Sequence, residues 1–348
     1  MLLVLSEFQV PSRFNNLNPF FLLLLCKRCL FPDTKPDLKF TDGICSACLY
    51  HETKKNIDWN LRKKELQDLF DNHVGNYWDC VIPISGGKDS HFITYYITQI
   101  LRKKPLLVSF IPSDQTPLGR KNIENIKHSF DVDCIEFYAK PSEYHNLQVK
   151  GLFELGDHAY PEHLGIFSIP IFLADKLGIN LIVWGENTSK EYGGTEKKDD
   201  QFTEGLFKDE LSLPDSPVYG YQKPNTVKSI YLGDYVEWDA KTQVELMKEY
   251  GFTTYGGPME WAFEDYENLD TKYVALHDYF KWLKYGYGRA TDQASIAIHH
   301  GRMTREEGEK LVAQYDGKLP TKYLNEFLGE FNLSMEDFLI LCKKFSKT

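Results

Sequence analysis

Hydrophobic positions along this 348-residue chain alternate between short apolar runs and longer stretches with helical spacing. Short apolar runs bounded by turn residues predict buried strands, whereas apolar residues three and four positions apart predict helices. The strands are expected at 79–85, 106–110, 134–138 and 181–184, and the helices at 91–101, 122–130 and 161–177. Because strands and helices alternate, we expect an α/β fold with a parallel twisted sheet and right-handed crossovers.

The C-terminal third has a different pattern, since helical spacing continues from about residue 240 without further strand-like runs. Thr304 and Glu307 form a capping-box pattern that opens one helix, expected to end near Asp316-Gly317, and Ser334 with Asp337 opens the last helix. The chain therefore divides into four predicted segments. They are an N-terminal extension (1–25), a cysteine-bearing ribbon (26–58), an α/β domain (59–239) and a helical C-terminal region (240–348).

Composition narrows the classes of function. The 40 Lys and Arg residues against 50 Asp and Glu residues give a net charge of -10, which argues against a broad nucleic-acid-binding face. The longest apolar run, Phe20–Leu25, is far shorter than the roughly 20 residues that a bilayer requires, and no small-residue cleavage site follows it. We expect a cytoplasmic protein without membrane insertion, whose first 25 residues pack on the domain or are disordered.

Four of the seven cysteines form two pairs, Cys26-x-x-Cys29 and Cys45-x-x-Cys48, with fifteen residues between them. This spacing is typical of a structural zinc site, because each pair can turn two sulfurs toward one cation and four thiolates at about 2.3 Å complete a tetrahedron. Turn residues between the pairs predict a compact, hairpin-like ribbon. An iron-sulfur cluster on the same ligands, two disulfides, or four unrelated cysteines are the alternatives. The isolated cysteines are expected to be buried structural thiols: Cys80, Cys134 and Cys342.

A glycine loop, Ser85-Gly-Gly-Lys-Asp-Ser90, lies between the first predicted strand and a helix. This context predicts an anion site, since glycines let backbone amides approach an anion and the helix N-terminus presents unpaired N–H groups. Lys88 adds a full positive charge, and the two serines add hydroxyl donors. Asp89 either assists Mg2+ binding or caps the helix.

Ligands of parallel sheets bind beyond the carboxyl ends of the strands. That rule places four segments around one crevice: Ser85–Ser90, Ile111–Asp114, Tyr138–Lys140 and Gly185–Asn187. Asp114 is a candidate for contact with a ribose or adenine, or is a solvated loop acid. Residues 186–216 carry nine acids and four lysines, which suits either a lid or plain solvated surface. Within that stretch, Tyr192-Gly-Gly is the part expected to touch substrate.

Aromatic residues and glycines interrupt the helical pattern at Lys284-Tyr-Gly-Tyr-Gly-Arg289. A glycine-flanked arginine beside aromatic rings suits an anionic, sugar-like ligand, because the guanidinium binds a carboxylate or phosphate with two hydrogen bonds. The alternative for Arg289 is a buried ion pair.

The loop Ser85–Ser90 resembles the signature of the ATP pyrophosphatases, which have the PP-loop fold. A narrower resemblance covers about residues 26–345 and is to the N-acetyl sugar amidotransferases of bacterial surface-polysaccharide, O-antigen and flagellin-glycan pathways. It rests on the loop together with Cys26-Lys-Arg-Cys-Leu-Phe-Pro-Asp-Thr, Gly185-Glu-Asn, Glu191-Tyr-Gly-Gly, Lys284-Tyr-Gly-Tyr-Gly-Arg-Ala-Thr and Thr304-Arg-Glu-Glu. Residues 1–25 fall outside the resemblance. His299-His300 departs from the pattern and is assigned no role.

The resemblance implies a ligase-type enzyme that adenylates the acetamido oxygen of an acidic or nucleotide-linked N-acetyl sugar. Ammonia then replaces AMP, so that the products are an acetamidino sugar, AMP and pyrophosphate. ATP, Mg2+ and structural Zn2+ are the implied cofactors, and a separate glutaminase, with a channel-forming synthase subunit, is the implied ammonia source. The implied catalytic residues are Lys88 and Asp89, and the implied ATP-binding residues are Ser85, Gly86, Gly87, Lys88, Asp89, Ser90, Asp114 and Gly185. The implied sugar-binding residues are Glu186, Asn187, Glu191, Tyr192, Gly193 and Arg289, and the metal ligands are Cys26, Cys29, Cys45 and Cys48.

Two other functions compete with this one. A tRNA thiolase of the same fold also combines N-terminal zinc cysteines with this loop, but it requires cysteines near the loop and a basic RNA-binding face. A non-catalytic zinc-ribbon module is the second alternative, and the intact loop with Lys88 argues against it. Nothing in the sequence names the sugar, the oligomeric state or the surface that a glutaminase would contact.

Overall fold

A five-stranded parallel sheet occupies the centre of the computed structural model, which describes residues 23–72, 77–194, 217–220 and 226–346. The strand order is β5-β4-β3-β6-β7. The strands are β3 (Cys80–Pro83), β4 (Pro105–Ile111), β5 (Cys134–Tyr138), β6 (Leu181–Trp184) and β7 (Lys228–Tyr231). The sequence predicts the first four. It misses β7, a short edge strand whose pattern is broken by the buried Ser229.

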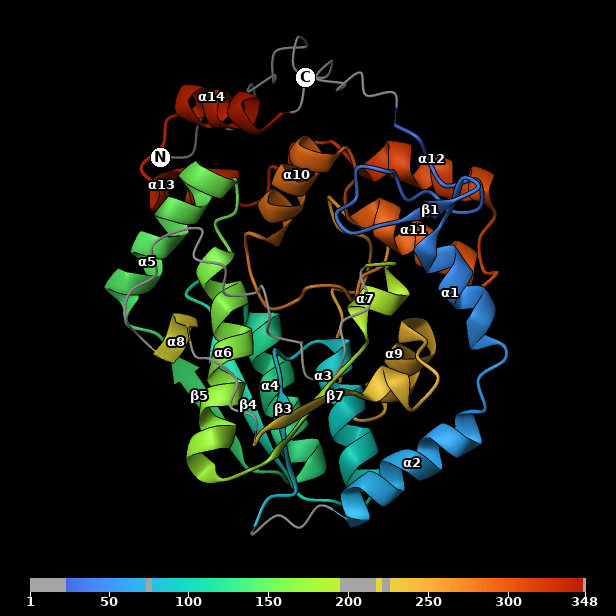
Figure 1. Ribbon diagram of the computed structural model, residues 1–348. Coiled ribbons are helices and arrows are strands. Elements are labelled where there is room, and N and C mark those ends of the chain that lie inside the picture. The colour runs from blue at the N-terminus through green and yellow to red at the C-terminus, as the bar shows by residue number, and fades with distance from the viewer. Residues whose placement is uncertain (1–22, 73–76, 195–216, 221–225, 347–348) are drawn as a thin grey trace.

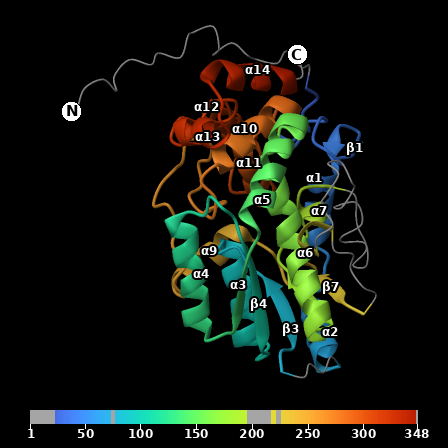
Figure 2. The same ribbon diagram turned by 90° about the vertical axis from the view of Figure 1, so that its left-hand side faces the viewer.

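Helices cover both faces of this sheet (Figure 2). Alternate strand residues point to opposite faces, so Ile82 and Val183 pack in one apolar cluster and Val81 and Ile182 in another. One face carries α3 (Lys88–Tyr95), its π-helical extension η1 (Tyr96–Ile100), α4 (Pro117–Phe130) and α9 (Ala240–Lys248). The other carries α5 (Pro141–Lys150) and α6 (Tyr160–Leu177). The π-helical η2 (Gly151–Leu155), which continues α5, packs through Leu152 against the C-terminal helices instead. The predicted α/β fold with a parallel sheet is confirmed.

The cysteine ribbon precedes the sheet and lies beside the C-terminal helices α11 (Arg289–His299) and α12 (Arg305–Tyr315) in Figure 1. It consists of the antiparallel strands β1 (Phe40–Thr41) and β2 (Ile44–Cys45), followed by α1 (Ser46–Lys54). The next helix, α2 (Trp59–Asp71), packs against the core of the sheet through Leu66 and Phe70. Asp42 and Gly43 connect the strands with positive φ angles, as turn residues of these types can. The ribbon is tied to α12 by the Arg305 side chain, which donates to the carbonyls of both Cys26 and Cys29.

The helical C-terminal region sits over the carboxyl ends of the strands (Figure 1). Besides α11 and α12 it contains α10 (Val274–Tyr285), α13 (Leu324–Glu330) and α14 (Met335–Phe345). Both predicted capping boxes are present, at Thr304 with Glu307 and at Ser334 with Asp337. Gly286 ends α10 with φ +77°, which is the break that the glycines predict. Shorter elements are α7 (Thr188–Glu191), α8 (Pro217–Gly220) and the 3-10 turn η4 (Leu232–Asp234).

Three sequence-based expectations concern parts of the chain that the structure describes only partly. Residues 1–22 of the predicted extension and residues 195–216 of the predicted lid lie outside the described residues. The division into four segments stays a prediction. Among the described helices, none combines the length and the apolar character needed to cross a membrane.

Candidate functional site

A cleft of about 750 Å³ opens where β3 and β6 end. These strands are neighbours in the sheet, but the chain leaves them in opposite directions, which is the position where α/β sheets bind ligands. The walls of the cleft include the loop after β3, the start of α7, the α10–α11 region and the tip of the ribbon. The expectation of four strand ends around the crevice is half right. Ile111–Asp114 and Tyr138–Lys140 do not line it, although Val108 and Phe110 of β4 do.

The glycine loop has the backbone form that an anion site needs. Gly86 has φ +90°, and a Cβ there would lie 2.7 Å from the carbonyl oxygen of Gly119, so only glycine fits without displacing backbone. Gly87 is the N-cap of α3 and provides no capping side chain, which leaves the first amides of the helix without a side-chain acceptor. Ser90 closes the loop, since its Oγ accepts a hydrogen bond from the Ser85 amide at 3.0 Å. This backbone is suited to phosphate oxygens.

Lys88 is buried beside carboxylates. Its Nζ lies 2.8 Å from Oδ2 of Asp89 and 3.6 Å from Oε1 of Glu267. Burial acts to lower the pKa of Lys88, but the negative charges of Asp89, Glu267 and Glu186 outweigh burial and hold that pKa well above its usual range. Lys88 is therefore a fixed positive charge. The second oxygen of Asp89, Oδ1, is buried and has no hydrogen-bond partner among the described residues.

Glu186 and Glu267 complete this charged group. Burial, the nearby Asp89 carboxylate and Glu267 raise the pKa of Glu186 to about 8, although Lys88 acts in the opposite direction. A group with such a pKa can exchange a proton near neutral pH. Glu267 was not predicted, because it stands in a loop between α9 and α10 with no motif around it, and only the tertiary fold brings it to Lys88.

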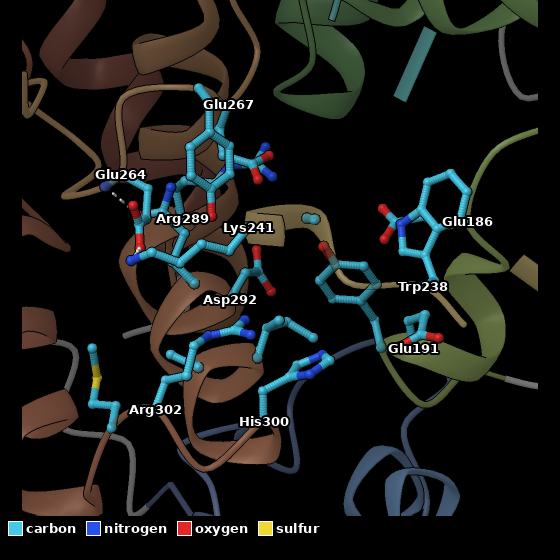
Figure 3. A pocket seen from close by; sticks show the side chains of 17 residues that line it. Glu186, Glu191, Trp238, Lys241, Glu264, Glu267, Arg289, Asp292, His300 and Arg302 are labelled. Carbon is cyan, nitrogen blue, oxygen red and sulfur yellow. Dashed lines mark hydrogen bonds and ion pairs between the residues drawn. The ribbon is translucent and has the colours of Figure 1, made fainter. Parts of the chain in front are cut away.

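A second, smaller cavity of about 80 Å³ adjoins the cleft. Figure 3 shows Glu186 and Trp238 on one side of it and the α11 side chains of Arg289 and Asp292 on the other. His300 and Arg302 line it as well. Glu186, Glu267, Arg289 and Asp292 line both cavities, so the carboxylates lie in their common wall. A cavity of about 80 Å³ has room for small molecules such as water or ammonia.

Arg289 lines the cleft and also forms an ion pair, which was the alternative to a ligand-binding role. Its Nε and Nη2 lie 3.0 and 3.2 Å from the two carboxylate oxygens of Asp278. Burial acts to raise the pKa of Asp278, but Arg289 and Lys281 hold that pKa at about 2. Asp278 stays ionised and fixes the guanidinium in place. The predicted role of Arg289 in sugar binding stays a prediction.

Some predicted site residues face other parts of the protein. Oδ2 of Asp114 accepts a hydrogen bond from the Tyr273 amide at 3.2 Å, and Asp114 does not line the cleft. Asn187 caps α7 and donates to Asp234, also outside the cleft lining. Asp114 and Asn187 thus hold loops that border the site.

Glu191 and Gly193 join α7 to the ribbon. Glu191 is buried, with Oε1 2.6 Å from Nζ of Lys54 and Oε2 3.0 Å from Nε2 of His51. A Cβ on Gly193 would lie 2.7 Å from the Ala47 amide nitrogen, so only a glycine permits this close approach. Tyr192, between them, lines both cavities.

Gly185 lines the cleft directly after β6.

A further group of titratable side chains lines the cleft on its α6 side and was not predicted, because the residues belong to separate elements. Asp270 is among them, and its pKa is raised to about 6 by burial. Beside it lie Glu162, His163 and His277.

The four ribbon cysteines form one cluster. All four sulfurs lie within 4.8 Å of one another, with Cys26 and Cys48 3.7 Å apart and Cys29 and Cys45 3.5 Å apart. A regular tetrahedron with metal–sulfur distances of about 2.3 Å has edges of about 3.8 Å. The arrangement therefore fits a single ion held by four thiolates, with no open coordination position. His299 adds a contact that the sequence did not reveal, because its Nε2 lies 3.2 Å from the Cys48 sulfur.

The isolated cysteines lie far from the loop. Cys80 and Cys134 begin β3 and β5, at the opposite end of the sheet from the cleft. Burial raises the pKa of Cys134 to about 11 and that of Cys342 to about 12, and it raises the pKa of Cys80 as well. None of these thiols is placed or activated for attack at the cleft, which is what a thiolase would require.

Comparison with known proteins gives one sequence match. Residues 252–348 match the model of a family described as LPS biosynthesis protein WbpG-like, C-terminal domain. The C-terminal part of the chain is therefore similar to a domain of LPS biosynthesis proteins. None of the curated proteins compared with the chain matches it.

Two solved structures illustrate distant similarity. The NMN synthetase from Francisella tularensis is 12% identical, with a TM-score of 0.39, over 76% of this chain and 98% of that one. The U34-tRNA thiolase NcsA from Methanococcus maripaludis with its [4Fe-4S] cluster is 12% identical, with a TM-score of 0.31, over 90% of this chain and 97% of that one.

Proposed function

We propose that this protein is an ATP-dependent N-acetyl sugar amidotransferase of surface-glycan biosynthesis. In this reaction the acetamido oxygen of the sugar attacks the α-phosphorus of ATP, and pyrophosphate leaves. Ammonia then adds to the activated carbon, the carbon–oxygen bond breaks, and AMP leaves with that oxygen. The product is an acetamidino sugar.

The observation that carries the proposal is the composition of the cleft. The glycine loop and Lys88 line it after β3, and Tyr287 and Arg289 line it from the α10–α11 region. A polyphosphate at the loop and a sugar beside Arg289 would therefore share one cavity of about 750 Å³. Adenylation requires such a juxtaposition, because the attacking oxygen must approach the α-phosphorus in line with the leaving pyrophosphate.

The residues present fit ATP and Mg2+. Backbone amides of Gly87 and Lys88 at the start of α3 are suited to phosphate oxygens, and Lys88 offsets the charge that develops on pyrophosphate. Mg2+ is usually held by one or two carboxylates together with substrate phosphates. Asp89, with its unpartnered Oδ1, and Glu267 are the carboxylates that would hold the ion. When bound, Mg2+ supplies further neutralisation of phosphate charge.

Glu186 is proposed as the proton acceptor for ammonia. Ammonium cannot act as a nucleophile until it loses a proton, and a carboxylate with a pKa of about 8 matches that requirement near neutral pH. Glu186 lies in the wall shared by the cleft and the smaller cavity. Ammonia arriving through the smaller cavity would meet this carboxylate before it reaches the sugar. A separate glutaminase, with or without a channel-forming subunit, is the proposed source.

The four-cysteine cluster is proposed to hold one structural Zn2+. Four thiolates suit zinc, and a closed coordination shell leaves no position for a substrate or water.

The proposal is tested by incubating the protein with ATP, Mg2+, ammonium and a panel of free and nucleotide-linked acetamido sugar acids. AMP, pyrophosphate and a sugar product one mass unit lighter than its substrate are expected, because NH replaces O. Formation of ADP, or of AMP without a change in the sugar, contradicts the assigned reaction. Glu186→Gln is the informative variant, since it should slow the ammonia-dependent step more than ammonia-independent exchange of pyrophosphate into ATP.

A further inference from the structure

The tip of the metal ribbon forms part of the cleft wall. Lys35, Pro36 and Asp37 line the cleft, although they belong to the stretch between the two cysteine pairs. Thr34, beside them, donates a hydrogen bond to the carbonyl of Tyr285 and so ties the tip to the end of α10. The ribbon therefore places a lysine at a defined position in the site.

Lys35 is a buried cation whose charge is only weakly paired. Its side chain is 14% exposed, and its Nζ donates one hydrogen bond, to Oη of Tyr287 at 3.3 Å. The carboxylate oxygen paired with it, Oδ1 of Asp292, is 3.9 Å away, beyond hydrogen-bond distance. An ammonium has three donors. Among the described residues, two N–H groups of Lys35 thus have no hydrogen-bond acceptor.

Three aromatic rings surround this ammonium group. Its Nζ lies 5.1 Å from the ring centroid of Phe31, 5.6 Å from that of Tyr192 and 5.0 Å from that of Tyr287. The rings hold the cation and exclude water from one side of it. They also offer flat apolar surface beside the charge.

The acids next to this ammonium group are paired mainly with other cations. Asp278 binds Arg289 through both oxygens, and Oδ2 of Asp292 lies 2.6 Å from Nζ of Lys281. Glu267 also acts on Arg289. Lys35, 3.9 Å from Oδ1 of Asp292, has the longest ion pair of these three cations. Burial, Lys281 and Arg289 lower the pKa of Lys35, and Asp292 only partly opposes them. A bound anion would therefore stabilise the charged form of Lys35.

We propose that Lys35, supported by Lys281, binds an anionic oxyacid group of the sugar substrate, a carboxylate or a phosphate. The inference rests on the proposed function for its sugar, but the binding itself does not require the reaction. It gives the metal ribbon a direct part in substrate recognition, since Lys35 is held by the segment that the four cysteines fold. The phosphate loop lines the same cleft and is left for ATP.

The experiment compares three probes by calorimetry with the full-length, metal-loaded protein. They are N-acetylglucosaminuronic acid, N-acetylglucosamine 6-phosphate and the neutral N-acetylglucosamine. The wild-type protein should prefer at least one of the acids to the neutral sugar, and the better acid identifies the anion. Lys35→Gln should reduce that preference about 10-fold or more, because hydrogen bonds to a charged group contribute that much.

Two further variants separate recognition from folding. Lys35→Arg keeps the charge and should retain most of the preference, whereas Lys39→Gln changes an exposed lysine of the same ribbon and should have no effect. Affinity for ATP should be the same in all three variants. An unchanged acid-to-neutral ratio in Lys35→Gln, or the absence of saturable binding of any probe to the wild-type protein, overturns the proposal. AMP formation is measured separately, so a failure of the amidotransferase reaction with charge discrimination intact refutes the proposed function alone.

Discussion

Replacing Glu186 by Gln should stabilise the protein at alkaline pH while it removes activity. The fold keeps this carboxyl among Asp89, Glu267 and low-dielectric surroundings, which raises its pKa from 4.5 to about 8. The folded protein therefore binds a proton that the unfolded chain has already released. Stability conferred by that proton is complete below pH 4.5 and is lost as the pH rises through about 8. Glutamine has no proton to lose, so the variant should not show this decline.

The size of the expected change in unfolding free energy follows from the raised pKa of Glu186. One pKa unit corresponds to about 1.4 kcal/mol, so ionisation of Glu186 between pH 6 and pH 8 should cost the wild-type protein about 2 kcal/mol of unfolding free energy. The difference in stability between Glu186→Gln and wild type should grow by that amount over the same interval. Activity should change in the opposite sense, because loss of a general base typically lowers the rate by about 10²-fold to 10⁴-fold.

Urea unfolding at several pH values measures the first effect, and AMP formation over the same pH range measures the second. Glu154→Gln is the matched control, since Glu154 is exposed and lies outside the cleft, and its pH dependence should equal that of wild type. Parallel stability–pH curves for wild type and Glu186→Gln would show that Glu186 is not a raised-pKa carboxyl. Wild-type activity that falls as the pH rises from 6 to 8 would show that it does not act as a base.

Other predictions test the loop, the arginine, the metal and the packing. Lys88→Met should lower the rate of AMP formation at least about 10²-fold in a steady-state assay, and full activity would refute the phosphate-loop assignment. Arg289→Ala should raise the KM for the sugar more than that for ATP, whereas equal effects would indicate a purely structural ion pair. Elemental analysis should find about one zinc per chain in wild type and none in Cys45→Ser, and bound iron would contradict the proposed metal. Gly165→Ala should lower the unfolding free energy by about 1–3 kcal/mol, because its Cβ would lie 2.4 Å from a β4 aromatic ring, while Gly329→Ala, with open space around it, should cost far less.

Features that depend on a few consecutive residues could be predicted from the sequence. The glycine loop, the two capping boxes and the cysteine spacing each specify local backbone geometry, and the structure contains all of them. The first four strands are equally local, because each is a compact apolar run. The strand β7 is not, since its four residues become a strand only by pairing with β6.

Residues of the site that come from separate elements could not be predicted in the same way. Glu267 and Lys35 carry no motif, and each reaches the cleft only because a distant segment folds over the sheet. Asp114 and Asn187 show the reverse difficulty, because each follows a strand but bonds to the Tyr273 amide or to Asp234. Their predicted roles in ligand binding stay predictions. Position in the chain predicts which loop is near a site. It does not predict which way a side chain points.

The contacts of the ribbon connect its cysteine cluster to the wall of the cleft. Arg305 holds the carbonyls of both Cys26 and Cys29, and Ser46 donates to the Gly193 carbonyl at 2.6 Å, directly after Tyr192 in the cleft wall. A metal ion bound by all four thiolates would fix the position of Lys35 and would also hold the hydrogen bond between Ser46 and Gly193 in place. Removal of the ion should therefore loosen the sugar side of the cleft, whereas the loop after β3 is supported by the sheet and does not depend on the ribbon. Loss of sugar discrimination before loss of ATP binding is the expected consequence.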